Sequence, residues 1–447
     1  MWKYPGRVAV VLIVSTGAIK TIQAQDSLSG TVRWDFQTCL DYAHKNNLQV
    51  QSLEQTKLSA DQDLLLAKAA RWPNLTGSVS QTVVKSKKNT NPVIGGFTTQ
   101  ASFSSNYSIN SSVTLFNGGY INNNIKQQGV NVQIASLNID VTQNDIILQI
   151  TQAFLNILLV KENIIYLQDA LNTSQAQLKQ GKQQFDAGSL SKKDYIQFES
   201  LVATDNYNLI TAHNSYRTNL MVLKQILQLT SAVDFDIVAP DTLGVKKVAA
   251  SLQTAEEIAM ATRPEIKSSE LSIDVAKYEL KKAKAARWPT VSLSAALSSG
   301  YSNNQTDAYF IQLDNNFYQR AGLSIAIPIF NNRIIKTAIE QAKIQIEQAR
   351  ISLLGTKMTL DQAVEQSYIA VLNAQSQFDA AGVQFQTNEE TYDITNKQLQ
   401  LGAINMVELL QQKTLYIQAL QAYIQAKYSV ILNQKVFDFY KGIPVTL

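Results

Sequence analysis

Cysteine, proline, glycine and charge are all scarce in this sequence of 447 residues. The single cysteine, Cys39, excludes an intramolecular disulfide. The 18 glycines and 8 prolines are about half the usual share, which excludes a collagen, a Pro-rich linker and an all-β chain with frequent turns. Charged residues make up 17% and hydrophobic residues 45%, so the chain is not a disordered polyelectrolyte. This composition indicates a few very long secondary-structure elements.

The usual motifs of catalysis and cofactor binding are also missing. The two histidines, His44 and His213, have no ligand-spaced partners, and the sequence has no glycine-rich phosphate loop. We therefore expect no enzymatic activity, no catalytic residue, no bound metal and no cofactor. The net charge of +4 does not indicate nucleic acid as a partner, because three of the basic residues lie in the N-terminal leader and no basic patch with interleaved aromatics follows.

Residues 1–24 read as a secretory signal peptide. Lys3 and Arg7 form its positive start, residues 8–14 its apolar core, and residues 22–25 a cleavage zone. The apolar core is too short for a comfortable membrane span. After the leader no run of 18 apolar residues occurs. If the mature chain crosses a membrane, it does so as β-structure.

The strongest feature of the sequence is an internal duplication. The heptapeptide AKAARWP at residues 67–73 recurs unchanged at 283–289. The tripeptide LFN at 115–117 corresponds to IFN at 329–331, at nearly the same offset along the chain. Anchors in the same order at a nearly constant offset define two copies of one unit. We expect a first repeat at 25–232, a linker at 233–251 and a second repeat at 252–447.

Each repeat has the same predicted order of elements. A helical stretch, 36–72 or 252–288, ends at a Trp-Pro, because proline disfavours helix in the residue before it. Alternating segments follow. In residues 103–115 the odd positions are mostly apolar and the even positions are small and polar, and residues 291–298 and 323–327 alternate in a similar way. This pattern fits strands with lipid on one side and water on the other.

Aromatic residues near these segments are candidates for the interfacial girdles of a membrane barrel. They are Trp72, Phe103, Tyr107, Trp288, Tyr301 and Phe317. Four strands from one chain cannot close a barrel, because known membrane barrels have at least about eight. Three chains would supply twelve strands, so the unpaired strand edges demand an oligomer.

A very long helix is predicted after each pair of strands. Residues 120–187 and 332–401 each reach about 100 Å at ~1.5 Å per residue, with apolar residues at coiled-coil spacing. Shorter return helices are predicted at 190–232 and 405–441. Each return helix and the N-terminal helix on which it stacks would together be about as long as one of the long helices. Glutamine and asparagine occupy positions where a cytosolic coiled coil has Glu and Lys. They indicate either the lining of a permissive conduit or the ordinary composition of a surface helix.

The duplicated order of helix, proline, two strands, long helix, glycine reversal and return helix resembles the TolC family of outer-membrane efflux proteins. Residues 71–73, 115–119, 185–188 and 194–195, with their second-copy counterparts, carry this resemblance over essentially the whole mature chain. It implies a mainly α fold with a membrane β-barrel. The expected assembly is a homotrimer with a twelve-stranded barrel in the outer membrane, continued by an α-helical coiled-coil tunnel across the periplasm.

The same resemblance implies a passive exit duct of a tripartite efflux or type I secretion system. Its partners would be two further copies of the chain, a periplasmic adaptor protein, an inner-membrane pump of RND, ABC or MFS type, and outer-membrane lipid. The adaptor would dock at the helical tip.

The predicted tip follows the two long helices. Gly188 and Gly402 lie where a left-handed helix stop is required. The candidate residues of the aperture and of adaptor docking are Gly188, Lys192, Lys193, Asp194, Gly402, Glu408 and Gln411.

Two roles are open for the acidic residues of this tip. Asp194 follows Ser191 by three positions, and Glu408 follows Asn405 by three positions, which is the spacing of a helix-capping box. Alternatively, threefold symmetry would place these carboxylates in a ring around the closed aperture. The two roles are compatible.

Two other functions fit part of the pattern. A periplasmic adaptor has a long helical hairpin, but it has one hairpin and turn-rich β-domains, whereas this chain has two hairpins and few turns. A coiled-coil scaffold would leave the alternating strands unexplained.

Overall fold

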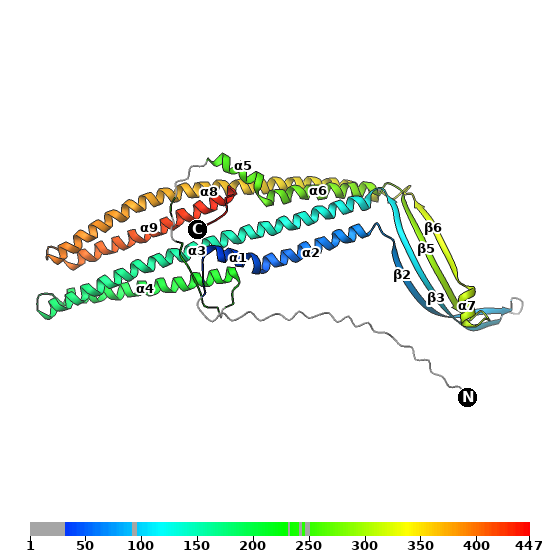
Figure 1. The fold of residues 1–447 in the computed structure, drawn as a ribbon, viewed down its shortest axis with the longest axis horizontal. Coiled ribbons are helices and arrows are strands. Elements are labelled where there is room, and N and C mark those ends of the chain that lie inside the picture. The colour runs from blue at the N-terminus through cyan, green and yellow to red at the C-terminus, as the bar shows by residue number, and fades with distance from the viewer. Residues whose placement is uncertain (1–31, 92–95, 231–232, 241–243, 246–250) are drawn as a thin grey trace, which may run out of the picture.

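The protomer is elongated, with a β-sheet at one end and two helical hairpin turns at the other (Figure 1). The computed structural model describes residues 32–91, 96–230, 233–240, 244–245 and 251–447, with 32, 86–91 and 96–100 described by their backbone alone. The predicted signal peptide at 1–24 lies outside the described residues, as do parts of the predicted linker.

The elements occur in two matching series. The first series is β1 (Val32–Trp34), α1 (Phe36–Asn46), α2 (Leu48–Ala69), β2 (Asn74–Asn91), β3 (Gly96–Asn117), α3 (Tyr120–Asp186) and α4 (Lys192–Leu227). The second series is β4 (Phe235–Ile237), α5 (Leu252–Thr262), α6 (Pro264–Ala285), β5 (Thr290–Ser302), α7 (Tyr309–Asn315), β6 (Tyr318–Ala326), α8 (Ile334–Gln400) and α9 (Met406–Tyr440). Helix α7 has no counterpart among the described elements of the first series. The predicted duplication is confirmed.

The long helices α3 and α8 each have 67 residues, which corresponds to about 100 Å. Their predicted bounds are confirmed to within two positions. Helix α4 returns along α3 with 36 residues, and α9 returns along α8 with 35 residues. One 18-residue stretch of α3 is long and apolar enough to span a membrane, but half of it is buried inside the protomer. This is typical of a core helix.

The prediction of one continuous helix before each Trp-Pro was wrong. The first helical stretch breaks at Asn47, whose extended backbone lets its side chain accept hydrogen bonds from the N–H groups of Gln49 and Val50 and so begin a new helix. The second stretch breaks at Arg263, because Pro264 disfavours helix in the preceding residue and occupies the first position of α6.

The four long strands form one antiparallel sheet in the order β2-β3-β5-β6. Each strand continues a helix, and the four helices next to the sheet have the same order, with α2 against α3, α3 against α6, and α6 against α8. Strand β2 and helix α2 therefore form one lateral edge of the protomer. Strand β6 and helix α8 form the other lateral edge.

A compact core lies at mid-length, where the helices of both repeats meet. Strands β1 and β4 pair in parallel there, with Val32 opposite Phe235. The largest fully buried side chains of this core include Phe154 and Ile150 of α3 and Leu223 and Leu227 of α4. This core joins the first repeat to α9 of the second.

Candidate functional site

The sheet has one apolar and one polar face, because strand pairing aligns the alternating positions of all four strands. The apolar face carries Leu75, Val79, Val83, Ile109, Val113, Leu293, Leu297, Leu323 and Ile325. The polar face carries Ser78, Ser80, Ser104, Ser108, Ser112, Ser292, Ser294, Ser298 and Ser324. Most of the large apolar side chains are exposed in the single protomer. This arrangement confirms the predicted alternation and fits a wall between lipid and water.

The predicted girdle aromatics fall into two groups at opposite ends of the sheet. Trp72 and Trp288 lie at the helical end, just before β2 and β5. At the far end the rings of Phe103 and Tyr301 lie 6.2 Å apart, and Tyr107 and Phe317 lie near them in the strand order. Strand β5, which separates Trp288 from the far end, has 13 residues. At a strand tilt of ~40° it spans ~33 Å, close to the ~30 Å hydrocarbon layer of a bilayer.

The short helix α7 at the far end was not predicted. Its Gln312 is almost fully buried and accepts a hydrogen bond from the N–H of Ser302 at 2.9 Å. The hydroxyls of Tyr107 and Tyr309 are 2.6 Å apart. Since Tyr107 belongs to the apolar face, α7 covers the far end of that face. The polar residues around it gave no sequence pattern that separates a helix from a loop.

The two hairpin turns are built alike at the opposite end of the protomer. Gly188 and Gly402 have φ values of +76° and +72°, which favour glycine because they lie in the left-handed region. The N–H of Ser189 donates to the carbonyl of Gln184, and that of Ala403 to the carbonyl of Gln398, both at 2.9 Å. These bonds close each long helix in the same way.

Both return helices begin at a side-chain cap. The Ser191 hydroxyl accepts from the N–H of Asp194 at 3.1 Å and donates to its carboxylate at 2.6 Å. The Asn405 side-chain oxygen accepts from the N–H of Glu408 at 3.1 Å. The first acid thus contacts the capping hydroxyl, whereas Glu408 contributes its backbone and its side chain is exposed.

A groove of about 360 Å³ separates the two hairpin tips. Asp194 and Gly402 line this tip groove, whereas Lys192, Lys193, Glu408 and Gln411 lie on the return helices outside its lining. The other side chains of the groove are mainly amides and apolar groups that sequence reasoning missed. They include Gln177, Gln180, Gln184, Phe198, Asn396, Leu399 and Met406. Gln177 bridges the groove by donating to Asn396 at 3.2 Å.

A buried ion pair lies above this groove and was also missed. Nζ of Lys413 in α9 is 2.6 Å from the Asp205 carboxylate in α4. One feature of the sequence could have predicted this ion pair. Lys413 lies at the 3–4 spacing of the buried residues Met406, Leu409 and Leu420. A charge at such a position indicates a buried partner. The partner itself is 208 residues away along the chain.

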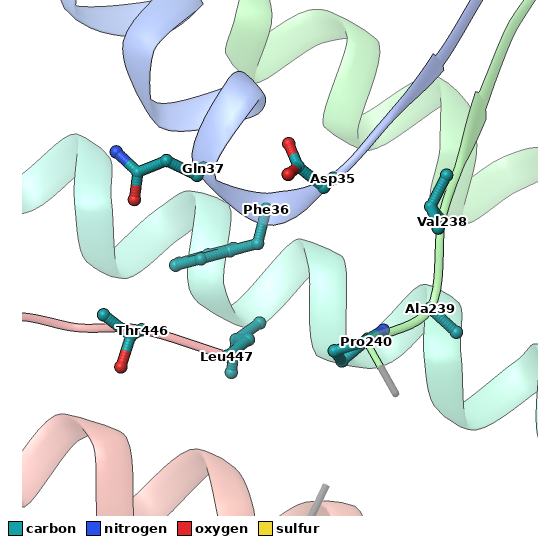
Figure 2. A pocket seen from close by; sticks show the side chains of 8 residues that line it. All are labelled: Asp35, Phe36, Gln37, Val238, Ala239, Pro240, Thr446 and Leu447. Atoms are coloured by element: carbon teal, nitrogen blue, oxygen red, sulfur yellow. The ribbon is translucent and has the colours of Figure 1, made fainter. Parts of the chain in front are cut away.

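A second pocket, of about 370 Å³, lies at mid-length where three chain segments meet (Figure 2). Its charged side chain is Asp35, which caps α1 by accepting from the N–H of Thr38 at 2.8 Å. Hydrogen bonds from Thr38 lower the pKa of the Asp35 carboxyl. The remaining lining is mostly apolar, including Phe36, Val238 and Pro240. We interpret this pocket as a packing gap.

The matching family model is the outer membrane efflux protein, over residues 39–228 and 257–435. The chain belongs to this family, which places it in the outer membrane with its helices extending into the periplasm. The outer membrane protein TolC of Escherichia coli is 23% identical over 303 residues, which cover 65% of this chain and 60% of TolC. The match therefore spans somewhat less than two thirds of the length of that relative.

Solved structures show the same fold. CusC has a TM-score of 0.77 at 18% identity, covering 94% of this chain and 96% of CusC. The outer membrane channel CmeC of Campylobacter jejuni has a TM-score of 0.76 at 17% identity, covering 91% of this chain and 85% of CmeC. The predicted mainly α fold with duplicated units of strands and long helices is confirmed for the single chain.

Proposed function

We propose that three copies of this chain form an exit duct of a tripartite efflux or type I secretion system. The twelve strands would form a barrel in the outer membrane, and the helices would continue it as a tunnel across the periplasm. Substrates would enter from an inner-membrane pump of RND, ABC or MFS type. The duct would be passive, with no enzymatic role, because the pump supplies the energy.

The observation that carries this proposal is the pair of lateral edges on a two-faced sheet. In the described part of the protomer, the four-stranded sheet leaves the outer edges of β2 and β6 without a partner strand and exposes an apolar face, which is unfavourable in water. Closure into a ring pairs both edges, turns the apolar face toward lipid and encloses the serine-rich face as the lumen. A periplasmic adaptor or scaffold protein is surrounded by water, so a sheet with an exposed apolar face would not be expected in it.

We further propose that the hairpin tips close the periplasmic entrance and receive the adaptor. The tip groove supports this proposal, since its amide and apolar lining suits the end of another helical hairpin. Asp194 lines the groove while also capping α4. Lys192 and Lys193 on the exposed side of the same turn would provide rim charges for the adaptor.

The repeat boundaries at 25–232 and 252–447 stay a prediction, and so do the girdle aromatics as lipid contacts. The far-end aromatics and the two tryptophans support a girdle at each membrane interface by their separation along β5.

The experiment is reconstitution of the purified full chain in planar bilayers. We expect trimers in outer-membrane extracts that dissociate on heating, and discrete single-channel conductance. A soluble periplasmic monomer without conductance would rule out the duct.

A further inference from the structure

The chain contains one complete copy of the joint between adjacent repeats. Inside the protomer, β3 of the first repeat pairs with β5 of the second, and α3 contacts α6. At the lateral edges the equivalent elements, β6 with α8 and β2 with α2, have no neighbour on their outer side within the described part of the protomer. The internal joint is therefore a template for the contact between two copies.

Each strand position in one repeat corresponds to one position in the other repeat, because the strand pairs β2–β3 and β5–β6 have the same register. Asn74 of β2 pairs with Ser112 of β3, and Thr290 of β5 pairs with Ala326 of β6. The number of positions from Asn74 to Thr290 is the same as the number between the two AKAARWP segments. The number of positions from Ser112 to Ala326 is the same as the number between LFN and IFN. Each position of β5 and β6 thus has a defined equivalent in β2 and β3.

We propose that β6 pairs antiparallel with β2 of a second copy in one defined register. This inference rests on the proposed trimer. The internal joint places Asn110 opposite Ala296, and the equivalents of these two residues are Ser324 and Ser80. Ser324 therefore lies opposite Ser80 of the neighbouring copy. Both residues belong to the polar face of their own sheets, so the lumen-facing surface continues across the joint.

The apolar faces match in the same register. Ser111 opposite Ala295 in the internal joint becomes Ile325 opposite Val79 of the neighbouring copy. Both side chains are exposed apolar residues in the single protomer. A shift by one residue would place each of them against the polar face of the next sheet, so the register is specified by both surfaces.

The internal joint has a bulge between Thr114 and Phe116, after which Phe116 lies opposite Val291. The equivalent positions are Pro328 and Phe330 on one copy and Leu75 on the next. A proline is tolerated at a bulge, because it has no N–H to donate to the ladder. Phe330 and Leu75 are 85% and 75% exposed in the single protomer, and this joint covers both.

The turn between strand and long helix has a similar backbone in both repeats but a different residue at its closest contact. Gly118, with φ of +65°, lies so close to Trp288 that an added Cβ would be 2.8 Å from the Trp288 Cβ. Its equivalent, Asn332, also has a positive φ, of +47°. The joint places Asn332 against Trp72 of the neighbouring copy, where a groove of about 590 Å³ runs beside the ring. Because Asn332 has a Cβ, it cannot approach Trp72 as closely as Gly118 approaches Trp288, so we expect this joint to be wider than the internal one at the turn.

Cysteine pairs test the register in the full chain. Directly opposite residues have Cβ atoms about 4.5–5.5 Å apart and diagonal ones about 7–8 Å, while a disulfide needs about 3.5–4.5 Å. We expect Ser80→Cys with Ser324→Cys to give covalent dimers and trimers on mild oxidation of outer membranes. Asn110→Cys with Ala296→Cys is the matched control, and it should oxidise within one chain. Ser78→Cys with Ser324→Cys is the register-shifted control, and its cross-linking should be at least fivefold lower.

Each outcome decides between the proposals. Preferential cross-linking of the shifted pair would overturn the register and leave the trimer intact. Oxidation of the intrachain control with no cross-link between copies in either pair would overturn the edge pairing. In that case the mass of the detergent-solubilised protein separates the two ideas: a trimer means that only this joint is wrong, whereas a monomer contradicts the duct as well.

Discussion

Nζ of Lys413 in α9 lies 2.6 Å from the carboxylate of Asp205 in α4, with only 5% and 9% of the two side chains exposed. The same Nζ also lies 3.5 Å from the carbonyl of Ala170 in α3. Three helices from two different hairpins therefore meet at one buried ion pair. The pair couples the hairpin of the first repeat to that of the second, a few helical turns from the tip.

Lys413→Met should destabilise this coupling strongly. It leaves Asp205 buried without a counter-charge, which typically costs about 3–5 kcal/mol. Denaturant unfolding measures the loss, and we expect the open-channel conductance of the variant to rise as the hairpins separate. Lys413→Met combined with Asp205→Leu should recover most of the stability, because the second change removes the unpaired charge. Equal stability of the single and double variants would mean that the pair is not buried in the assembled protein.

The two roles of Asp194 can be separated by two neighbouring substitutions. Ser191→Ala removes the cap and should cost about 1 kcal/mol with little effect on ion selectivity. Asp194→Asn keeps the backbone N–H that Ser191 accepts from but removes the charge, so cation preference in planar bilayers should fall. Glu408→Gln is the comparison for an exposed acid outside the groove. Unchanged selectivity in both acid variants would leave helix capping as the role of Asp194.

Arg320 should set the charge preference of the barrel. It pairs with Ala296 at a position of the polar face. The strand residues 74–84, 101–117, 290–302 and 318–326 contain no other charged residue, and the lysines of β2 (Lys85, Lys87 and Lys88) lie beyond them, next to its turn into β3. Three copies would form a cationic ring in the lumen. Arg320→Gln should shift the reversal potential toward cation selectivity, whereas Arg320→Lys should not. Identical reversal potentials for all three proteins would place this side chain outside the ion path.

A ladder of stacked rings holds α8 against α9. Tyr423 lies 5.3 Å from the ring centroids of both Phe378 and Phe385, and Tyr416 stacks on Tyr392 at 5.2 Å. Tyr423→Ala should cost about 2 kcal/mol, less than the ~3–5 of a fully buried aromatic because the ring is half-buried. Hydrogen exchange in the α8–α9 hairpin should speed up accordingly. Tyr423→Phe keeps the ring and should have no such effect.

Cys39 should be inert in the folded chain. Burial raises the pKa of its thiol to about 12, and the nearby Asp35 carboxylate adds to the rise. At pH 8 the native protein should resist a maleimide reagent and should react fully once unfolded in guanidinium. Because the folded pKa is the higher one, this group favours the folded state at neutral pH, and that contribution falls as pH rises from about 9 toward 12. Rapid labelling of the native chain would contradict this burial.

Much of the fold was predictable because its signals are local or repeated. The two copies of AKAARWP, the strand alternation and the glycine reversals each depend on a few neighbouring residues, and the structure places them as expected. The helix breaks at Asn47 and Arg263 were missed, although a capping side chain and a following proline were present in the sequence. Equivalent positions in the two repeats use different residues to make the same break.

The sequence by itself determined the two long helices, the duplication and the two faces of the strands, because periodicity and turn residues act within a few positions of the chain. Only the tertiary structure decided which surfaces meet. The pairing of Lys413 with Asp205, the tip groove and the internal joint between β3 and β5 each bring together residues that lie far apart along the chain. No local preference specifies such contacts, since they depend on how the burial of many helices is satisfied at once.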